Sequence, residues 1–260
     1  MERLPEYYSH DETVEGITSF YELMLRIHGE DMAILERPPP TGWPQITVES
    51  FAGLGKTEEV IKLLRHIPYL VTGPDAVPCI LESTSPIEYI DTQFCEEVKK
   101  LPPVEPLEDD TDERLPGHIL RFAEGRRDGY TLLIDTRRGV VVLWKNDGNL
   151  PRWTGNFDAD FYDENEDPYG KDGWKCMPTY RIKTFFDFCM EQYLVLNWLP
   201  DLVSGGVIQI DDPASPNESQ LKRRQIMIDA GWPGVDGQGT EWDKKKAMRE
   251  TEEAQDAFEI

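Results

Sequence analysis

The densest group of side chains that could do chemistry is a run of carboxylates between residues 158 and 167. Its acidic members are Asp158, Asp160, Asp163, Glu164, Glu166 and Asp167. A calcium loop of the EF-hand type requires glycine at its sixth position and glutamate at its twelfth, and here these positions hold Asp163 and Tyr169. The run therefore fails as a dedicated cation site, although clustered carboxylates leave an adventitious calcium site open. We interpret it as a solvated acidic loop or, more specifically, as a surface that binds a partner, with Trp153 and Trp174 as apolar anchors.

Two further motifs suggest catalysis at first sight. The sequence Gly53-Leu54-Gly55-Lys56-Thr57 is similar to the end of a phosphate-binding loop, but that loop needs a glycine where Ser50 stands. We therefore interpret Thr57 as the cap of a helix, because a threonine hydroxyl accepts backbone hydrogen bonds at this position. Ser204 lacks the leading glycine of a nucleophile elbow. Neither motif predicts a nucleotide site or a nucleophile.

The histidines and cysteines are too scattered to indicate a site. His10, His28, His66 and His118 stand far apart in the sequence, and none accompanies a nucleophile motif. The four cysteines form no CxxC pair and stand without histidines at zinc-ligand spacing, so we interpret them as buried thiols of a reducing compartment. We accordingly predict no catalytic residue, no metal ligand and no cofactor. The alternative is an enzyme of unknown class whose site is assembled from residues distant in sequence.

Net charge is the strongest compositional signal. The 260 residues contain 50 acidic and 27 basic side chains, which gives a formal net charge of -23 at pH 7. Such a surface repels nucleic acids and anionic membranes, so we expect neither as a partner. It favours association with another protein that carries a basic patch. No stretch has the apolar core of a signal peptide or the length of a membrane span, which predicts a cytoplasmic protein, with the nucleus left open.

The elements that must position these side chains centre on residues 129–145. Two apolar runs, 132–134 and 140–144, flank the polar segment Asp135-Thr136-Arg137-Arg138-Gly139, which predicts an antiparallel hairpin with glycine at its turn. The runs lack alternation, so both faces of the hairpin should be covered. Residues 118–122 could add a preceding strand. With helices before and after it, this pattern predicts an α+β fold with a mainly antiparallel sheet.

Helical periodicity occurs on both sides of the hairpin. The predicted helices are 14–27, stopped by Gly29; 58–67, capped by Thr57; 181–199, stopped by Pro200; and 216–230, stopped by Gly231. Short strands are predicted at 79–81 and 87–90, and residues 37–44 as an extended arm anchored by Trp43. Residues 241–260 should form a solvated helix or a disordered tail that folding does not require.

This pattern divides the chain into three segments. They are an N-terminal helical segment at 1–36, a main α+β domain at 37–212 and a C-terminal helix with an acidic tail at 213–260. The proline-rich stretch after residue 36 marks the first boundary, because proline cannot continue a helix.

Three short motifs resemble one known family. They are Gly129-Tyr130-Thr131-Leu132-Leu133-Ile134-Asp135, Gly139-Val140-Val141 and Thr184-Phe185-Phe186-Asp187-Phe188. Together, over roughly residues 118–200, they resemble the core of the SUKH superfamily, which includes fungal regulators of cell-wall assembly and bacterial immunity proteins. The block 42–69 is also similar to uncharacterised proteins of filamentous fungi. The resemblance implies an α+β domain without catalytic residues, and hence an adaptor or regulatory role in protein binding.

Overall fold

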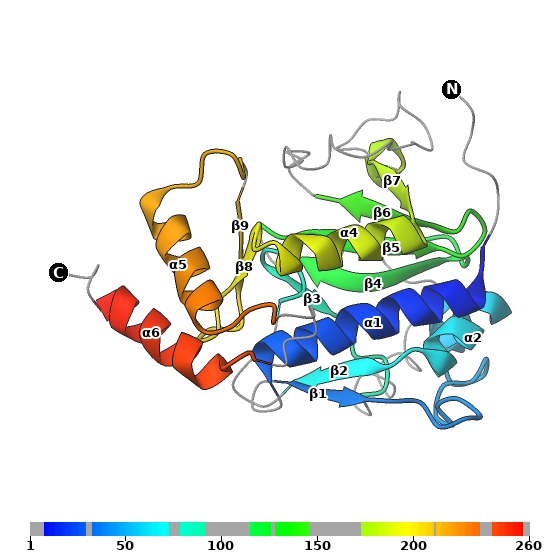
Figure 1. Cartoon of the computed structure of the whole chain (residues 1–260). Helices are drawn as coiled ribbons and strands as arrows, with labels where there is room; N and C mark the ends of the chain where they lie inside the picture. The colour runs from blue at the N-terminus through cyan, green and yellow to red at the C-terminus, as the bar shows by residue number, and fades with distance from the viewer. Residues whose placement is uncertain are drawn as a thin grey trace.

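An antiparallel sheet of five strands forms the centre of the chain in this computed structural model (Figure 1). The strands lie in the order β3 (Thr84–Pro86), β4 (Ile119–Gly125), β5 (Thr131–Asp135), β6 (Val140–Trp144) and β7 (Thr179–Arg181). The structure describes residues 8–29, 33–72, 79–91, 115–125, 128–145, 173–210, 212–234 and 241–256. The predicted α+β class with a mainly antiparallel sheet is confirmed.

The predicted central hairpin is formed by β5 and β6. Asp135 pairs with Val140 at the turn. The Asp135 carboxylate accepts hydrogen bonds from the backbone N–H of Arg137 at 2.7 Å and of Arg138 at 3.2 Å. Gly139 closes the turn with a φ of 66°, a left-handed conformation that glycine adopts without steric cost. The preceding strand expected at 118–122 is β4.

Both faces of the hairpin are buried, as its unalternating sequence predicted. Leu132 and Ile134 belong to the main core, whereas Leu133 and Val142 belong to a second cluster. The second cluster is completed by Leu115, Ile119, Trp144, Trp174 and Met177. Successive side chains of a strand point to opposite faces, so the two clusters cover the two sides of the sheet.

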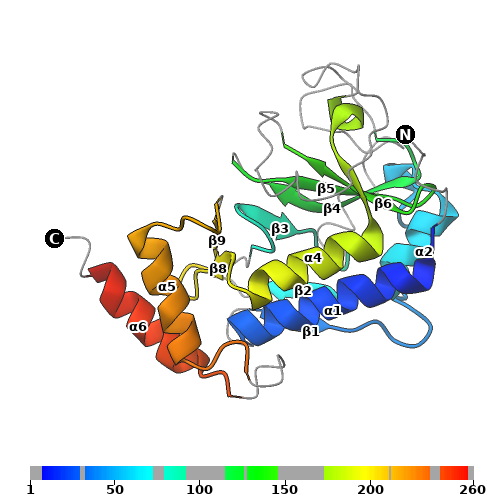
Figure 2. The ribbon, with the colours of Figure 1, turned by 45° about the horizontal axis from the view of Figure 1, so that its top comes forward.

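Helices α1 (His10–His28) and α4 (Ile182–Leu194) lie side by side along one face of the sheet and run in the same direction (Figures 1 and 2). The ring of Phe186 on α4 lies 5.6 Å from that of Phe20 on α1 and 5.7 Å from that of Phe122 on β4, measured between centroids. A Cβ atom at Gly16 would meet the Phe186 ring at 3.3 Å, so glycine allows the helices to approach closely. Helix α1 shares one core with the sheet, and the expected boundary at residue 36 does not separate two packing units.

The starts of α1 and α2 (Glu58–His66) follow from their capping residues. Ser9 Oγ accepts a hydrogen bond from the Glu12 N–H at 3.3 Å, and Gly29 ends α1 with a φ of 71°. The Thr57 hydroxyl accepts from the Val60 N–H at the start of α2. The interpretation of Thr57 as a helix cap is therefore confirmed.

A two-stranded sheet of β1 (Ala33–Glu36) and β2 (Tyr69–Thr72) lies beside α1 and was not predicted. Trp43 belongs to the segment between them and is only 8% exposed. Its indole Nε1 donates to the Ile67 carbonyl at 2.9 Å, and its ring centroid lies 5.9 Å from that of Tyr69. The expected arm with Trp43 as its anchor is confirmed.

Several predicted boundaries differ in the structure. Helix α4 ends at Leu194 and does not continue to residue 199, because Leu196 adopts a left-handed φ of 58° that no helix tolerates. Trp198–Pro200 is strand β8, which pairs with β9 (Val207–Gln209). Within residues 79–91 the two expected strands are not formed, because Leu81 bridges Thr84 across a tight turn and the strand there is β3.

The C-terminal region docks on the fold, so residues 244–256 are neither a wholly solvated helix nor a disordered tail, and the expectation that folding does not require them stays a prediction. Helices α5 (Glu218–Asp229) and α6 (Lys244–Asp256) pack against each other. Ala247 of α6 is 0% exposed and belongs to the main core. Lys246 Nζ donates to the Asp229 carbonyl at 2.6 Å, and so satisfies an oxygen at the end of α5. Helix α6 thus has one buried face, and the expected boundary at residue 213 does not isolate it from the core.

Candidate functional site

The expected partner-binding loop lies almost wholly outside the described residues. This holds for Asp158, Asp160, Asp163, Glu164, Glu166, Asp167 and Trp153, whose role stays a prediction. Trp174 is described, in the short 3-10 helix Gly173–Cys176, and it is 2% exposed. Its ring packs with Trp144 and Met177 in the second cluster. Trp174 is therefore a core residue and not an exposed anchor for a partner.

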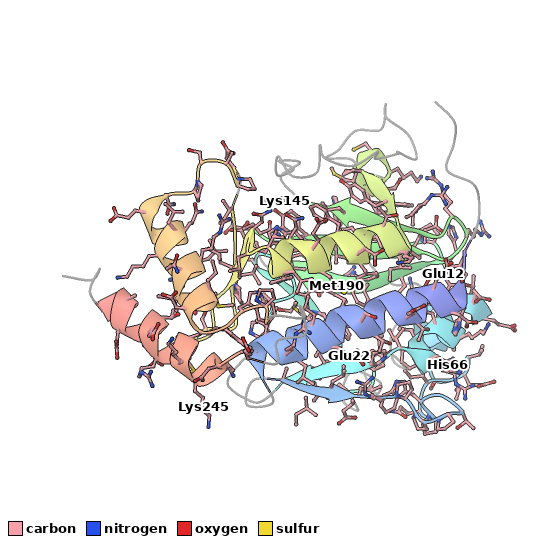
Figure 3. The ribbon with its side chains drawn as sticks, viewed as in Figure 1. Glu12, Glu22, His66, Lys145, Met190 and Lys245 are labelled. Atoms are coloured by element: carbon pink, nitrogen blue, oxygen red, sulfur yellow. The ribbon has the colours of Figure 1, made fainter. Side chains whose placement is uncertain are left out.

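A different acidic surface lies on the helical layer. The exposed residues of α1 are all carboxylates: Asp11, Glu12, Glu15 and Glu22. The neighbouring helix α4 adds exposed Asp187 and Glu191. Figure 3 labels Glu12 and Glu22 along α1 and Met190 on α4 beside it. We call the set Glu12, Glu15, Glu22, Asp187 and Glu191 the acidic helical face.

Lys183 shows that carboxylates of both helices act at one place. Its Nζ lies 2.6 Å from Asp187 Oδ2. The hydrogen bond and charge of Asp187 raise the pKa of Lys183, and the charges of Glu15 and Glu12 raise it further. The side chains are largely exposed, so this arrangement contributes little to stability and leaves most of the negative charge facing solvent.

A pocket of about 270 Å³ opens where α1 and α4 begin. Its lining consists of Ser9, Glu12, Thr13, Gly139, Arg181, Ile182, Lys183 and Thr184. The Thr13 hydroxyl donates to the Ser9 carbonyl at 2.7 Å, and the Ile182 N–H donates to Gly139 at 3.2 Å. Hydroxyls, a carboxylate and two cations suit the binding of a polar group. Among these lining residues there is neither a histidine nor a cysteine, which would be the usual base or nucleophile.

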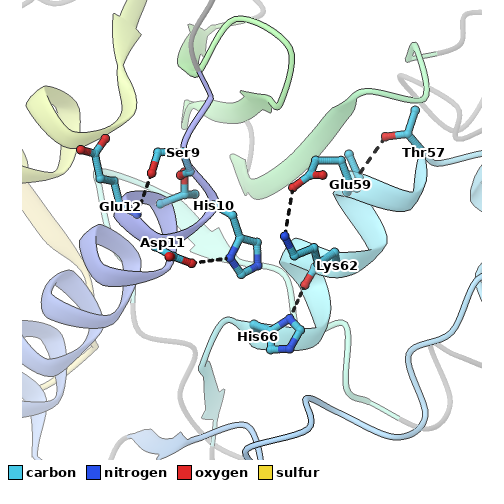
Figure 4. Close-up of polar contacts among 10 residues, drawn as sticks. Ser9, His10, Asp11, Glu12, Thr57, Glu59, Lys62 and His66 are labelled. Carbon is cyan, nitrogen blue, oxygen red and sulfur yellow. Dashed lines mark hydrogen bonds and ion pairs between the residues drawn. The ribbon is translucent and has the colours of Figure 1, made fainter.

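Two histidines far apart in sequence meet on the other side of the start of α1 (Figure 4). The rings of His10 and His66 lie 5.3 Å apart in an edge-to-face arrangement. His10 Nδ1 lies 3.0 Å from Asp11 Oδ1, and this contact lowers the pKa of Asp11. His66 Nδ1 lies 2.7 Å from the Lys62 carbonyl oxygen, so that nitrogen carries the proton and donates it.

This polar corner joins α1 to α2 and does not form a metal site. Lys62 Nζ completes it on α2, 3.8 Å from Glu59 Oε1. Among the described residues, no group of three or more histidine, cysteine or acidic side chains is arranged to hold a metal ion. The arrangement therefore positions two helices, and we assign no chemistry to it.

The acidic turn of the hairpin has a structural role. Asp135 is 0% exposed, and its burial raises the pKa of its carboxyl group, against the two backbone N–H groups that favour the charged form. Burial also disfavours the charged form of neighbouring His118, and so lowers the pKa of its imidazole. Because the Asp135 carboxylate already accepts from Arg137 and Arg138, we interpret it as the group that shapes the turn.

The acidic helical face was not predicted, because its carboxylates are spread along two helices whereas those of the 158–167 run are adjacent in the sequence. A signal was present in the sequence, since Glu12, Glu15 and Glu22 recur at intervals of three and seven residues, opposite Ile17 and Phe20. The contribution of α4 had no local signal, because its position beside α1 is set by tertiary packing.

Comparisons of the chain with models of protein families, with curated proteins and with solved structures found no match. The resemblance to the SUKH superfamily therefore rests on the three sequence motifs alone. Of these motifs, the first two form the hairpin and the third lies in the first half of α4. Among the described residues, none of the helices is both long and apolar enough to cross a membrane.

Proposed function

We propose that this chain is a non-catalytic, SUKH-like protein-binding domain that engages a basic partner through its acidic surface. The observation that carries the proposal is the convergence of Glu12 and Glu15 of α1 with Asp187 of α4 around Lys183. Carboxylates from two helices thus act on one patch of surface, which gives a basic partner a single place to dock.

The electrostatics of the whole chain support this role. A net charge of -23 steers a positively charged protein toward the surface and raises the rate of encounter. Met190, partly buried on α4 next to Glu191, offers an apolar contact among the acids. Interfaces commonly combine such a partly desolvated apolar contact with a charged rim.

The test begins with the binding partner captured by the wild-type chain and measures association rates at two salt concentrations. Glu12→Gln, Glu15→Gln and Asp187→Asn are combined in one variant, which removes three charges from the acidic helical face. The matched control, Glu241→Gln, Glu252→Gln and Glu253→Gln, removes three exposed charges around α6. We expect the first variant to slow association about tenfold at low salt and the control to change it much less.

A third variant neutralises the six acids of the 158–167 run, and so separates the two acidic surfaces. If association is slower for this variant alone, the partner binds the 158–167 run and not the acidic helical face. An association rate that changes neither with salt nor in any of the three variants would show that the acidic surface does not take part in binding.

A further inference from the structure

His28, the last residue of α1, is fully buried and has no hydrogen-bond partner among the described residues. It is 0% exposed, and both of its ring nitrogens lie out of reach of water. Buried polar groups are paired in the great majority of folded proteins, so an unpaired imidazole requires an explanation. The explanation must concern its surroundings, because hydrogen bonding does not hold the ring in place.

Two charged side chains act on His28 from other elements. Lys244 belongs to the start of α6, and Asp201 belongs to the turn after β8. A Cβ atom at Gly29 would lie 3.0 Å from Lys244 Nζ, so the first residue of α6 packs on the end of α1. The Asp201 carboxylate already accepts from the backbone N–H of Val203 at 3.0 Å and of Ser204 at 3.2 Å. It is therefore only partly available to balance a new positive charge.

These surroundings favour the neutral imidazole of His28 over the protonated one. Burial, and secondly the charge of Lys244, lower the pKa of His28 from 6.5 to about 4, while Asp201 opposes the change. A helix C-terminus by itself would favour a cation. Here the loss of hydration and the neighbouring ammonium outweigh that preference.

We propose that neutral His28 is an acid-sensitive latch that keeps the start of α6 docked on the end of α1. Protonation of its ring would place a second positive charge beside Lys244, where neither ring nitrogen has an acceptor among the described residues. The strain is relieved when α6 leaves the end of α1 and water reaches the imidazole.

The fold allows this release without loss of the central sheet. Helix α6 packs chiefly on α5, at the side of the central sheet (Figure 1). The link to the remaining core runs through Trp232, whose ring meets Trp242 at 5.3 Å and faces the Arg26 guanidinium at 5.4 Å. The hairpin of β5 and β6 lies in a different part of the core, so its hydrogen bonds should persist.

Hydrogen–deuterium exchange of the full chain at pH 7 and pH 5, corrected for intrinsic exchange rates, tests the latch. With the two pKa values above, acidification from pH 7 to pH 5 should weaken docking on the order of 20-fold. Protection of residues 244–256 should fall by about that factor, while protection of β5 and β6 should stay unchanged. Equal loss in the hairpin, or unchanged protection in α6, would overturn the proposal.

Variants identify the group that titrates. His28→Gln should make the protection of α6 independent of pH over this range, whereas His66→Gln should behave as wild type. Lys244→Met leaves the His28 ring in place and removes the repulsion, so it should reduce the pH effect even if His28→Gln does not fold. An undiminished pH effect in Lys244→Met together with one in His28→Gln would show that another group is responsible.

Discussion

The ring of Phe186 lies 5.6 Å from the ring of Phe20, and this contact joins the two parallel helices over the sheet. Both rings are 0% exposed. Phe186→Ala should lower the free energy of unfolding by about 3–5 kcal/mol, because the cavity cannot close between two helices and a strand. Phe188→Ala, at a partly exposed ring on the same helix, is the matched control and should cost less than half as much. Urea denaturation measures both, and equal losses would show that the Phe20–Phe186 contact is not central.

The turn between β5 and β6 depends on the Asp135 carboxylate. Asp135→Ala removes the acceptor for two partly buried backbone N–H groups and should lower the free energy of unfolding by about 1–2 kcal/mol. Asp135→Asn keeps one acceptor oxygen, so its free energy of unfolding should fall clearly less than that of Asp135→Ala. Thermal denaturation distinguishes the two variants. If alanine and asparagine are equally destabilising, the charge of Asp135 matters and its hydrogen bonds do not.

Docking of α6 should be sensitive to charge on its buried face. Ala247→Glu would place a carboxylate in the core and should destabilise the protein by about 3 kcal/mol, or detach the helix. Lys245→Glu, at an exposed position of the same helix, reverses a charge without entering the core and should have little effect (Figure 3). Melting temperatures compare the two. An unchanged melting temperature in Ala247→Glu would mean that α6 does not dock.

Acid should weaken the folded state through His28 in a defined window. The pKa of His28 is about 4 in the folded chain and 6.5 otherwise, so the folded state binds this proton less tightly. Its contribution to stability is complete above about pH 6.5 and is lost as the pH falls toward 4. The difference corresponds to about 3 kcal/mol, at about 1.4 kcal/mol for each unit of pKa. Denaturation measures the free energy of unfolding of the wild type and of His28→Gln across this range. The two free energies should converge in acid, because only the wild type loses the contribution of a neutral His28.

Local sequence signals predicted the parts of the fold that depend on neighbours in the chain. The hairpin followed from two apolar runs around Gly139, and the end of α1 from its apolar stripe and Gly29, whereas the helix begins at His10, four residues before the predicted start at residue 14. The end of α4 did not follow, because Leu196 adopts a left-handed conformation just before β8, and that conformation leaves no trace in the composition of the segment.

The candidate site was less predictable for the same physical reason. Asp187 and Glu15 are distant in sequence and share a surface because Phe186 and Gly16 pack between their helices. Burial of Ala247 likewise depends on α5, so the charged sequence of α6 gave no sign of its docked face. Trp174 seemed to flank an exposed loop, but its ring fills the second cluster beneath the sheet.

The shared direction of α1 and α4 gives the acidic helical face a polarity along its length. Peptide dipoles of parallel helices add, leaving partial positive charge at the starts and partial negative charge at the ends. Helix α1 balances its start with Asp11 and Glu12 and its end with Arg26, whereas α4 has no acidic residue in its first turn and no basic one in its last. Cations at Arg181 and Lys183 add to the positive end. A basic partner that docks on Glu12, Glu15 and Asp187 should therefore bind in one preferred orientation, with its own positive charge directed away from Arg181 and Lys183. A paramagnetic label at either end of the partner would reveal which way it lies.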